Sequence, residues 1–294
     1  MDLNTSVSTC NTSTKINTEK VLYNDMFPVK IIGNGNDDTN KKFEKAKSGF
    51  FDFETDILWF NVLQLVVLHT IGIYGLLTFD YMKNPMTTLW IIGMYIISNF
   101  GAADGAHRFW SHKSFKAKLS LRILLLICFS ASAQNALYQW VKYHRMHHKY
   151  CDTNADPHNT KRGFFFAHFG WLMMKEHPEY IEKSKKLDLS DIMSDPVVAF
   201  DKKYFLPLQL FFGFILPTAM PVYLWNETWG RAIISQVFIR YIITLNTVWT
   251  INSIAHAWGT RPYDKYVIYT RIYDIYHLRI KLCNCIYIYS TTEN

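Results

Sequence analysis

Cysteine is scarce in this chain of 294 residues, and its placement excludes two common uses of the residue. The five cysteines are Cys10, Cys128, Cys151, Cys283 and Cys285. An odd number scattered in this way gives no disulfide framework, and Cys283-Asn-Cys285 lacks the two-residue spacing of a zinc knuckle. We therefore expect the protein to work in a reducing, cytosol-facing environment.

The first part of the chain has few apolar residues. Residues 1–46 are rich in Asn, Thr, Ser, Lys and Asp, and they contain no apolar core of the kind that a cleavable signal peptide needs. We expect a polar, disordered tail there. The net charge of +7 would suit a nucleic-acid-binding protein, but no run of Lys and Arg alternates with aromatic residues in a recognisable module. Nucleic acid is therefore not an expected partner, and a membrane explains the basic balance better.

Long apolar stretches are what the chain has in quantity, each near the ~20 residues that cross a bilayer as a helix. The four stretches cover residues 57–79, 86–106, 206–225 and 232–253. Short connections at Asp80–Pro85 and Asn226–Gly230 join them into two hairpins. This pairing favours an all-α integral membrane protein with four transmembrane helices over a large soluble protein with buried helices.

Basic residues are distributed unevenly around these stretches. Of the 31 Lys and Arg residues, all but Lys83, Arg231 and Arg240 lie outside the two hairpins. The positive-inside rule assigns the side that carries the basic residues to the cytosol. We therefore expect both termini and the long central segment to be cytosolic.

Three short clusters of histidine carry the chemistry. The clusters hold His107 and His112, then His144, His147 and His148, then His256. The second cluster is spaced i, i+3 and i+4, which places its three imidazoles on one helical face. Imidazoles gathered in this way repel when protonated and serve little purpose in packing, so the spacing predicts ligands for a metal such as iron or zinc. Six such ligands suit two metal ions better than one, held in a histidine-rich helical cap.

The other histidines and the nearby carboxylates are weaker signals. His107 and His112 are five residues apart, so on an α-helix they need a helix end or a bend between them in order to converge. A lone histidine such as His256 is more often a structural residue. The nearby carboxylates, which either orient an imidazole N–H or are ordinary turn residues, are Asp104, Asp152 and Asp156. The histidines that we do not expect to be ligands are His158, His168 and His177.

A fifth apolar stretch, Leu119–Tyr138, is expected not to cross the membrane. If it crossed, the first and second histidine clusters would lie on opposite faces of the bilayer and could share no metal. Arg122 and the polar run Ser130–Asn135 also suit a helix that lies along the interface.

Together these motifs resemble the membrane acyl-CoA delta-9 desaturases (stearoyl-CoA desaturases) of insect type. The segments that carry the resemblance are Gly105–His112, His144–Tyr150, Asp156–His158, Arg162–Phe166, His168–Trp171 and Asn252–Lys265. The resemblance covers residues 47–265 and marks them as the desaturase domain.

The resemblance implies a di-iron enzyme of the endoplasmic reticulum membrane. Such an enzyme uses O2 and electrons from cytochrome b5 and its reductase to introduce a cis double bond into a saturated fatty acyl-CoA. A C–H bond in the middle of an alkyl chain has no acidic proton, so a metal must supply a strong oxidant. The resemblance also implies that Asn252 reaches one iron through a water. The residues that it places along the acyl chain and at the coenzyme A end are Asn61, Gln134, Asn135, Trp140 and Trp249. A related histidine-box hydroxylase stays open, because ligand spacing alone does not fix the outcome.

The chain departs from this family after Lys265. The family continues to a further histidine box of the form His-Asn-x-His-His, whereas residues 266–294 are rich in Tyr and Ile and contain only His277. Three of the family's nine histidine ligands are therefore absent from this atypical tail, which resembles translated non-coding sequence. We predict little or no desaturase activity from these 294 residues as written, and a truncated, non-catalytic membrane protein is the alternative function.

Overall fold

The computed structural model describes residues 55–257, with side chains as far as Ile254. Within this part of the chain the regular elements are helices, and one isolated antiparallel bridge joins Ile57 to Met174. The tail expected over residues 1–46 and the atypical segment 266–294 lie outside the described residues.

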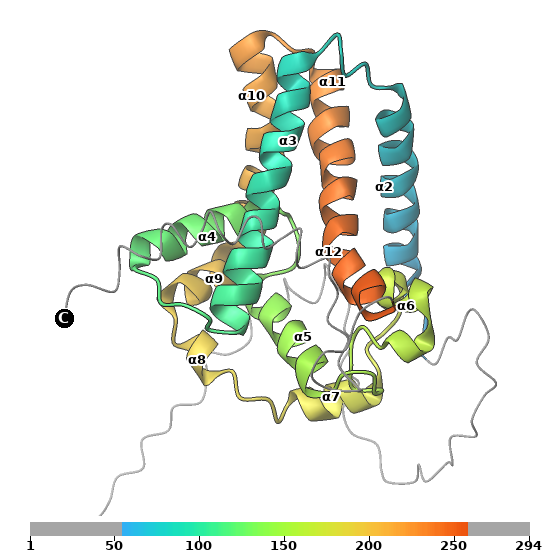
Figure 1. Ribbon diagram of the computed structural model, residues 1–294, viewed down its shortest axis with the longest axis vertical. Helices are drawn as coiled ribbons and strands as arrows, with labels where there is room; N and C mark the ends of the chain where they lie inside the picture. The colour runs from blue at the N-terminus through green and yellow to red at the C-terminus, as the bar shows by residue number, and fades with distance from the viewer. Residues whose placement is uncertain (1–54, 258–294) are drawn as a thin grey trace, which may run out of the picture. The chain divides into compact units, whose positions relative to one another are not determined.

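Four helical runs are long and apolar enough to cross a membrane, which confirms the expected all-α membrane architecture. The runs are Trp59–Thr78, Pro85–Ser111, Pro196–Trp225 and Trp229–Ile254. Each overlaps one of the stretches expected from hydropathy, and the second and third extend further toward the histidine-bearing end. The runs consist of α2 (Trp59–Thr78); α3 (Pro85–Phe100) with η1 (Gly101–Ser111); α9 (Pro196–Gln209), η4 (Leu210–Ile215) and α10 (Leu216–Trp225); and α11 (Trp229–Ile233), η5 (Ile234–Ile239) and α12 (Arg240–Ala257). Helices α2, α3 and α12 run alongside one another in Figure 1.

The fifth apolar stretch is divided by a turn into two helices. Helix α4 (Leu119–Ala131) has 13 residues, about 20 Å of helix, which is too short for a hydrocarbon core of about 30 Å. Ala133 then adopts a left-handed conformation with φ of 49°, and α5 (Leu137–Lys149) begins after it. Helix α4 lies across α3 instead of along it (Figure 1), as expected for a helix that does not cross.

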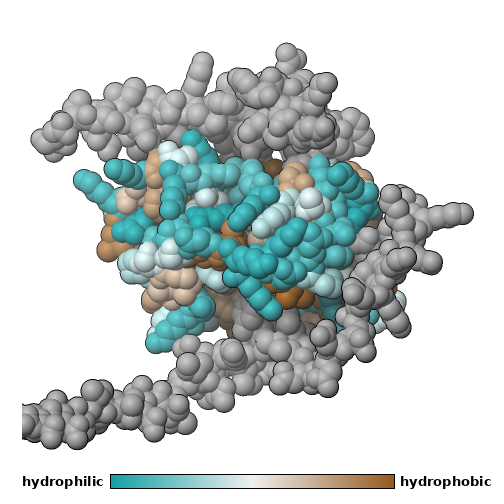
Figure 2. All heavy atoms as spheres, turned by 90° about the horizontal axis from the view of Figure 1, so that it is seen from below, coloured by the Kyte–Doolittle hydropathy of each residue, from teal (hydrophilic) through white to brown (hydrophobic). Residues whose placement is uncertain are grey.

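Helix α5 and a set of short helices form a cap at one end of the four runs (Figure 1). The short helices are η2 (Thr160–Arg162), α6 (Phe164–His168), η3 (Gly170–Met173), α7 (Pro178–Ser184) and α8 (Ser190–Met193). Viewed onto this end, the molecule shows mostly hydrophilic side chains (Figure 2). The polar cap and the apolar runs therefore separate as they would at a membrane surface.

An apolar core fixes the cap to the membrane helices. Trp110 of η1, Phe129 of α4, Val141 of α5 and Val198 of α9 are buried in one cluster. Because these four residues belong to four different elements, their packing holds the helix that carries the second histidine cluster close to the end of the second run.

A fully buried arginine ties the membrane helices together. Arg240, with 0% of its surface exposed, donates from Nη1 to the carbonyl of Ala131 at 2.9 Å, from Nε to that of Gln236 at 3.0 Å, and from Nη2 to that of Gly213. Ala131 is the last residue of α4, and a carbonyl at a helix end carries partial negative charge that stabilises a guanidinium. Among the described residues Arg240 has no carboxylate partner, so these carbonyls balance its charge. The arginine thus fixes the end of α4 against α12 and η4.

Candidate metal centre

His107 and His112 converge because the second run ends as a π-helix, η1. The backbone N–H of His112 donates to the carbonyl of His107 at 3.1 Å, a bond that spans five residues. Residues five apart therefore lie on one side of this wider helix, and the two ring centroids are 4.6 Å apart. The expected helix end is present at Ser111, between the two residues, and the π-helical winding before it, which the spacing did not reveal, also brings the two rings together.

Close packing of the backbone explains a glycine at the start of η1. A Cβ atom on Gly101 would lie 2.1 Å from the carbonyl carbon of Cys128 in α4. Only glycine allows α4 to approach η1 so closely, and α4 in turn supports the π-helical turn that carries His107.

The second cluster lies on α5, whose N-terminus is capped by a distant carboxylate. Asp201 of α9 accepts a hydrogen bond of 2.7 Å from the backbone N–H of Leu137, the first residue of α5. Val141 and Met146 of α5 are buried, and Nε2 of His144 lies close to Nε2 of His112, at the end of η1, and to Nε2 of His148. An otherwise unsatisfied N–H group and an apolar face therefore both fix the rotation of the histidine helix.

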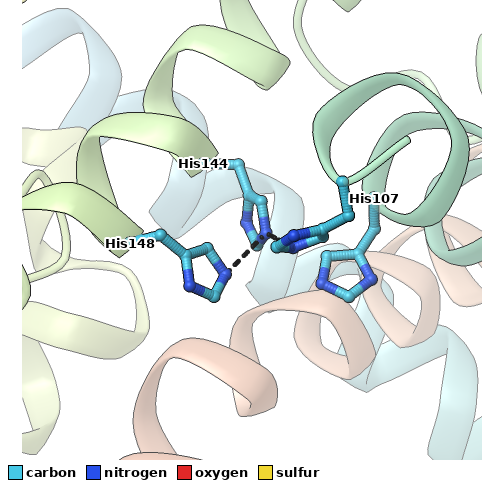
Figure 3. Close-up of side chains that lie close together, drawn as sticks. His107, His144 and His148 are labelled. Carbon is cyan, nitrogen blue, oxygen red and sulfur yellow. Dashed lines mark hydrogen bonds between the residues drawn. The ribbon is translucent and has the colours of Figure 1, made fainter. Parts of the chain in front are cut away.

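Four histidines from these two elements form one cluster. One ring nitrogen from each of His107, His112, His144 and His148 lies within 4.8 Å of the other three. Nε2 of His144 lies 2.9 Å from Nε2 of His112 and 3.0 Å from Nε2 of His148. In Figure 3 the rings of His144 and His148, from α5, and His107, from η1, gather around one space. Three Nε2 atoms that meet in this way cannot all be satisfied by protons, whereas one metal ion can accept a lone pair from each.

The environment keeps these imidazoles neutral. Burial holds the pKa of His144 well below 6.5, and the positive charges that neighbouring histidines would carry lower it further. Burial and then the guanidinium of Arg145 lower the pKa of His112. A metal ion binds the neutral form of imidazole, so at neutral pH His144 and His112 are in the form that binds metal.

His147 faces away from this cluster and is held by a carboxylate. Its Nδ1–H donates to Asp156 at 2.8 Å, and both side chains are buried. Asp156 also accepts from the backbone N–H groups of His158 and Asp152, each at 2.9 Å. Burial favours the protonated carboxyl, but these interactions, that with His147 first, hold the pKa of Asp156 below its usual value. The bond fixes the tautomer of His147 and leaves Nε2 as its ligand atom.

The other two carboxylates have local roles. Asp152 has a φ of 59° and accepts from the hydroxyl of Thr160, which makes it a turn residue. Asp104 pairs with Arg108 at 3.0 Å along η1. Of the two interpretations left open by the sequence, orientation of an imidazole therefore applies to Asp156 alone among these three.

Cys151 lies close to His147 and Asp156, with potential ligand atoms within 4.8 Å of one another. Burial, together with the charges of Asp152 and Asp156, raises the pKa of its thiol to about 12. At neutral pH Cys151 is therefore a thiol, whereas metals bind the thiolate.

Arg145 connects the two histidine-bearing elements, a role that the sequence did not reveal. It makes a two-pronged ion pair with Asp191, at 2.8 and 2.7 Å. It also donates to the carbonyls of Trp110 at 2.9 Å and Ser111 at 3.3 Å, at the end of η1. The sequence offered one signal for this role, the position of Arg145 next to His144. A residue one step along a helix points away from its neighbour, so Arg145 was not expected to be a ligand.

Two of the five predicted substrate residues lie beside the cluster. The indole of Trp140 is stacked on the ring of His144, with centroids 5.1 Å apart and planes at 18°. Its N–H donates to the side-chain oxygen of Gln134 at 2.9 Å.

The other three predicted substrate residues lie in separate surroundings. Asn61 of α2 donates to the carbonyl of Leu172 at 2.8 Å, and the carbonyl of Asn135 accepts from Gln209 at 3.1 Å. Trp249 is buried in α12. Its ring contacts His69 and His168, each with centroids 6.0 Å apart.

Helix α12 carries the two remaining predicted ligands. Asn252 is half-buried there, and the side chain of His256 lies outside the described side chains. The structure therefore brings together four of the six predicted histidine ligands and places His147 beside them.

The three histidines that were not expected to be ligands have other partners. His168 contacts Ser253 at 2.8 Å and Asn246 at 3.1 Å, and Asn246 reaches His69 at 3.2 Å. This chain of hydrogen bonds joins α6, α12 and α2. His177 caps α7 by accepting from a backbone N–H at 3.1 Å, and the ring of His158 contacts Trp171 with centroids 4.4 Å apart.

Curated proteins match the sequence, although no protein-family model does. The chain is 44% identical over 223 residues both to an acyl-CoA Delta-9 desaturase of Acheta domesticus and to stearoyl-CoA desaturase 5 of Bos taurus. The chain belongs to the acyl-CoA desaturase family. Each match covers 76% of this chain, but only 62% of the length of the Acheta protein and 66% of that of the Bos protein.

A further relative bears on the position of the double bond. The chain is also 44% identical over 213 residues to an acyl-CoA Delta(11) desaturase of Spodoptera littoralis, covering 72% of this chain and 63% of that protein. Relatives at equal identity thus carry different positions in their names, so overall similarity does not determine which bond a desaturase of this family oxidises.

Proposed function

We propose that this desaturase introduces a cis double bond at the delta-9 position of a saturated fatty acyl-CoA. O2 is the oxidant, and cytochrome b5 with its reductase is the electron donor. The observation that carries the proposal is the cluster of four imidazoles at the end of the long apolar helices. An alkyl chain is available at that boundary, and the curated relatives have desaturase names.

Two iron ions are the proposed cofactor. His107, His112, His144 and His148 would hold one iron, since their ring nitrogens already share one space. His147 and His256, with Asn252 through a water, would contribute to the second. When bound, the iron pair supplies the oxidant that a C–H bond without an acidic proton requires. Asp156 keeps Nε2 of His147 free of its proton, and burial keeps His144 neutral.

The acyl chain is proposed to pass the indole of Trp140, which is stacked on His144 and fixed by Gln134. Trp249 and Asn135 would line the deeper part of the acyl site, and Asn61 its coenzyme A end. In such a site the distance between the thioester and the iron pair selects the bond that is oxidised. The delta-9 position therefore depends on local shape.

The proposed location is the endoplasmic reticulum membrane, with both termini and the cap in the cytosol. The support is the charge distribution, because the two connections on the far side contain one basic residue, Lys83, and Arg231 directly follows the second connection. A glycosylation cassette with flexible spacers, inserted after Lys83, should be modified in microsomes, and the same cassette after Lys161 should not. Modification after Lys161 would contradict the topology.

Complementation in yeast that lacks its own delta-9 desaturase tests the activity. Residues 1–265 should be joined to the C-terminal region of the Acheta desaturase, which supplies the missing histidine box, and the 294-residue chain should be expressed in parallel. We expect growth without added unsaturated fatty acid from the chimera. The 294-residue chain should support little growth, because three expected ligands are absent from its sequence.

Fatty-acid analysis of the same cells separates the alternatives. Monounsaturated products support a desaturase, and the double-bond position shows whether delta-9 is right. Hydroxylated products from the chimera would replace the proposal by a histidine-box hydroxylase. A chimera that contains iron but forms no product would contradict the proposed activity. Strong growth from the 294-residue chain would show that the last histidine box is dispensable.

A further inference from the structure

A cavity of about 480 Å³ lies where the second membrane run ends and α4 begins. Trp110, which belongs to the apolar core, and the carboxylates of Asp191 and Asp195 form part of its wall. The remaining lining residues are Phe109, Lys113, Phe115, Lys116, Ala117, Arg122 and Ile192. The cavity thus combines aromatic and basic side chains and contains no predicted metal ligand.

The charge of this cavity favours an anion. Asp195 pairs with Arg122 at 3.2 Å, and Asp191 pairs with Arg145, so the two carboxylates are already balanced by guanidinium groups. Nζ of Lys113 also pairs with the carboxylate of Asp191, at 2.8 Å. Lys116 is exposed and makes no ion pair with a described residue. The Nε–H of Arg122 is buried and has no hydrogen-bond partner in the described part of the chain. The cavity therefore has excess positive charge and an unused donor.

An exposed apolar strip begins beside the cavity. Leu119, Ile123 and Leu124 of α4 are 51%, 46% and 50% exposed, whereas Leu125 and Phe129 on the other face are buried. Lys118 precedes the strip at the start of α4 and is also exposed. A basic pocket next to an apolar helix face matches a molecule with an anionic head and a hydrocarbon tail.

The position along the second run indicates where that molecule comes from. The run ends at Ser111 and the cavity is built from residues that follow directly, so the cavity is at the level of the lipid headgroups. Helix α4 runs across α3 at this level (Figure 1). Aromatic and basic residues are typical of this boundary, and lysines near it are attracted to anionic lipid.

We propose that the cavity and the strip on α4 bind an anionic phospholipid of the leaflet next to the histidine cap. Its phosphate and headgroup carboxylate contact Lys116, Lys113 and the Nε–H of Arg122, and an acyl chain lies along Leu119, Ile123 and Leu124. The lipid stabilises α4 in the membrane surface. It is distinct from the acyl-CoA proposed as substrate, which passes Trp140.

Native mass spectrometry of the purified full chain can test this proposal. The protein should be titrated in detergent with equimolar palmitoyl-oleoyl phosphatidylserine and phosphatidylcholine, and with inorganic phosphate in a separate sample. We expect preferential retention of phosphatidylserine. Lys116→Gln should weaken it about five-fold, and Lys116→Gln with Lys118→Gln about 25-fold, from roughly 1 kcal/mol for each basic residue near an anionic lipid. Lys185→Gln, at an exposed lysine of the cap, is the matched control and should change nothing.

Two further variants test the pocket and the strip separately. Ala117→Trp fills the cavity and should abolish the preference for phosphatidylserine, while Ile123→Asn should weaken both lipids. Equal retention of the two lipids, or unchanged binding in Lys116→Gln and Ala117→Trp, would overturn the proposal. Displacement of phosphatidylserine by inorganic phosphate at equal concentration would also overturn it, because the site would then bind a free anion. If binding depended on the lysines but was unchanged in Ile123→Asn, the occupant would be an acidic soluble protein and the lipid proposal would be wrong.

Discussion

Polar side chains gather at both ends of the helical bundle, but their hydrogen-bonding states differ. At the end with the short connections, Glu227 accepts from the hydroxyl of Thr87 at 2.6 Å, from the backbone N–H of Thr228 at 2.9 Å and from the guanidinium of Arg231. At the cap end, the Nε2 atom of His144 faces two other Nε2 atoms at 2.9 and 3.0 Å. Every oxygen of Glu227 has a donor, whereas the ring nitrogens of the cluster face one another.

This difference separates a structural polar cluster from a binding site. A buried carboxylate with complete hydrogen bonding holds α3 and α11 together and has no capacity left for a ligand. Neutral imidazoles whose lone pairs converge gain little from one another, so their arrangement requires a further partner. The two ends should therefore respond differently to mutation: one should lose stability and the other should lose metal.

The largest expected effect is the loss of iron from the cap end. His144→Ala removes the nitrogen at the centre of the cluster. In the chimera we expect iron to bind at least ~100-fold more weakly and desaturation to be absent. Loss of a residue that only orients a ligand weakens metal binding about 10- to 100-fold, and loss of the ligand itself should cost more. His147→Ala should act in the same direction. Iron per folded protein, measured by plasma mass spectrometry, is the readout. His177→Ala, which removes a helix cap, is the control, and iron retained in His144→Ala would disprove the cluster as the metal centre.

A second change tests orientation without removing a ligand. Asp156→Asn places an amide N–H₂ opposite the backbone N–H of Asp152, or opposite Nδ1–H of His147 and the backbone N–H of His158, so at least one bond is lost. We expect iron affinity and turnover to fall about 10- to 100-fold. Asp152→Asn, in the neighbouring turn, is the matched control. Equal losses from both variants would mean that the effect comes from the turn and not from the imidazole.

The opposite end should show the reverse pattern. Glu227→Gln replaces one acceptor oxygen by a donor facing Thr87 or Arg231, and we expect a loss of about 2 kcal/mol of stability with unchanged iron per folded protein. Burial would raise the pKa of Glu227, but its bonds with Thr87, Arg231 and Thr228 lower it. The carboxylate therefore stabilises the protein at neutral pH, and that contribution disappears as the pH falls through the lowered pKa.

Thermal unfolding in detergent, measured at neutral and acidic pH, checks this expectation. The difference in stability between the parent and Glu227→Gln should shrink in acid. A constant difference across the pH range would show that the charge of Glu227 does not contribute to stability. Loss of iron at neutral pH would show that the two ends are not independent.

The smallest expected effect concerns the link between the two histidine-bearing elements. Asp191 pairs with Arg145 of α5 and with Lys113, which follows His112. These ion pairs hold the pKa of Asp191 below its usual range, with Arg145 the main cause. Asp191→Asn should reduce turnover about three-fold, near 0.6 kcal/mol of altered positioning, and leave iron content unchanged. Asp188→Asn is a nearby exposed control. Equal turnover in the two variants would show that Asp191 does not position the histidine-bearing elements.

Much of the architecture was predictable because it depends on local patterns. Apolar runs near the length of a bilayer predicted the four membrane helices, and the i, i+3, i+4 spacing placed His144, His147 and His148 on one helix. The spacing could not show that His147 is turned toward Asp156, because that contact depends on the turn after α5. Nor could it show that His107 and His112 align, since the π-helical turn forms only where α4 packs on Gly101.

The sequence by itself therefore determined the membrane class, the histidine ligand types and the family, because hydropathy, residue chemistry and motif spacing are properties of short segments. Only the tertiary structure decided which imidazoles share a space, which carboxylate orients His147, and how Arg145 and Asp201 hold α5 in place. Those contacts join residues as far as 64 positions apart, as between Leu137 and Asp201. Their geometry depends on packing between helices, which no local pattern encodes.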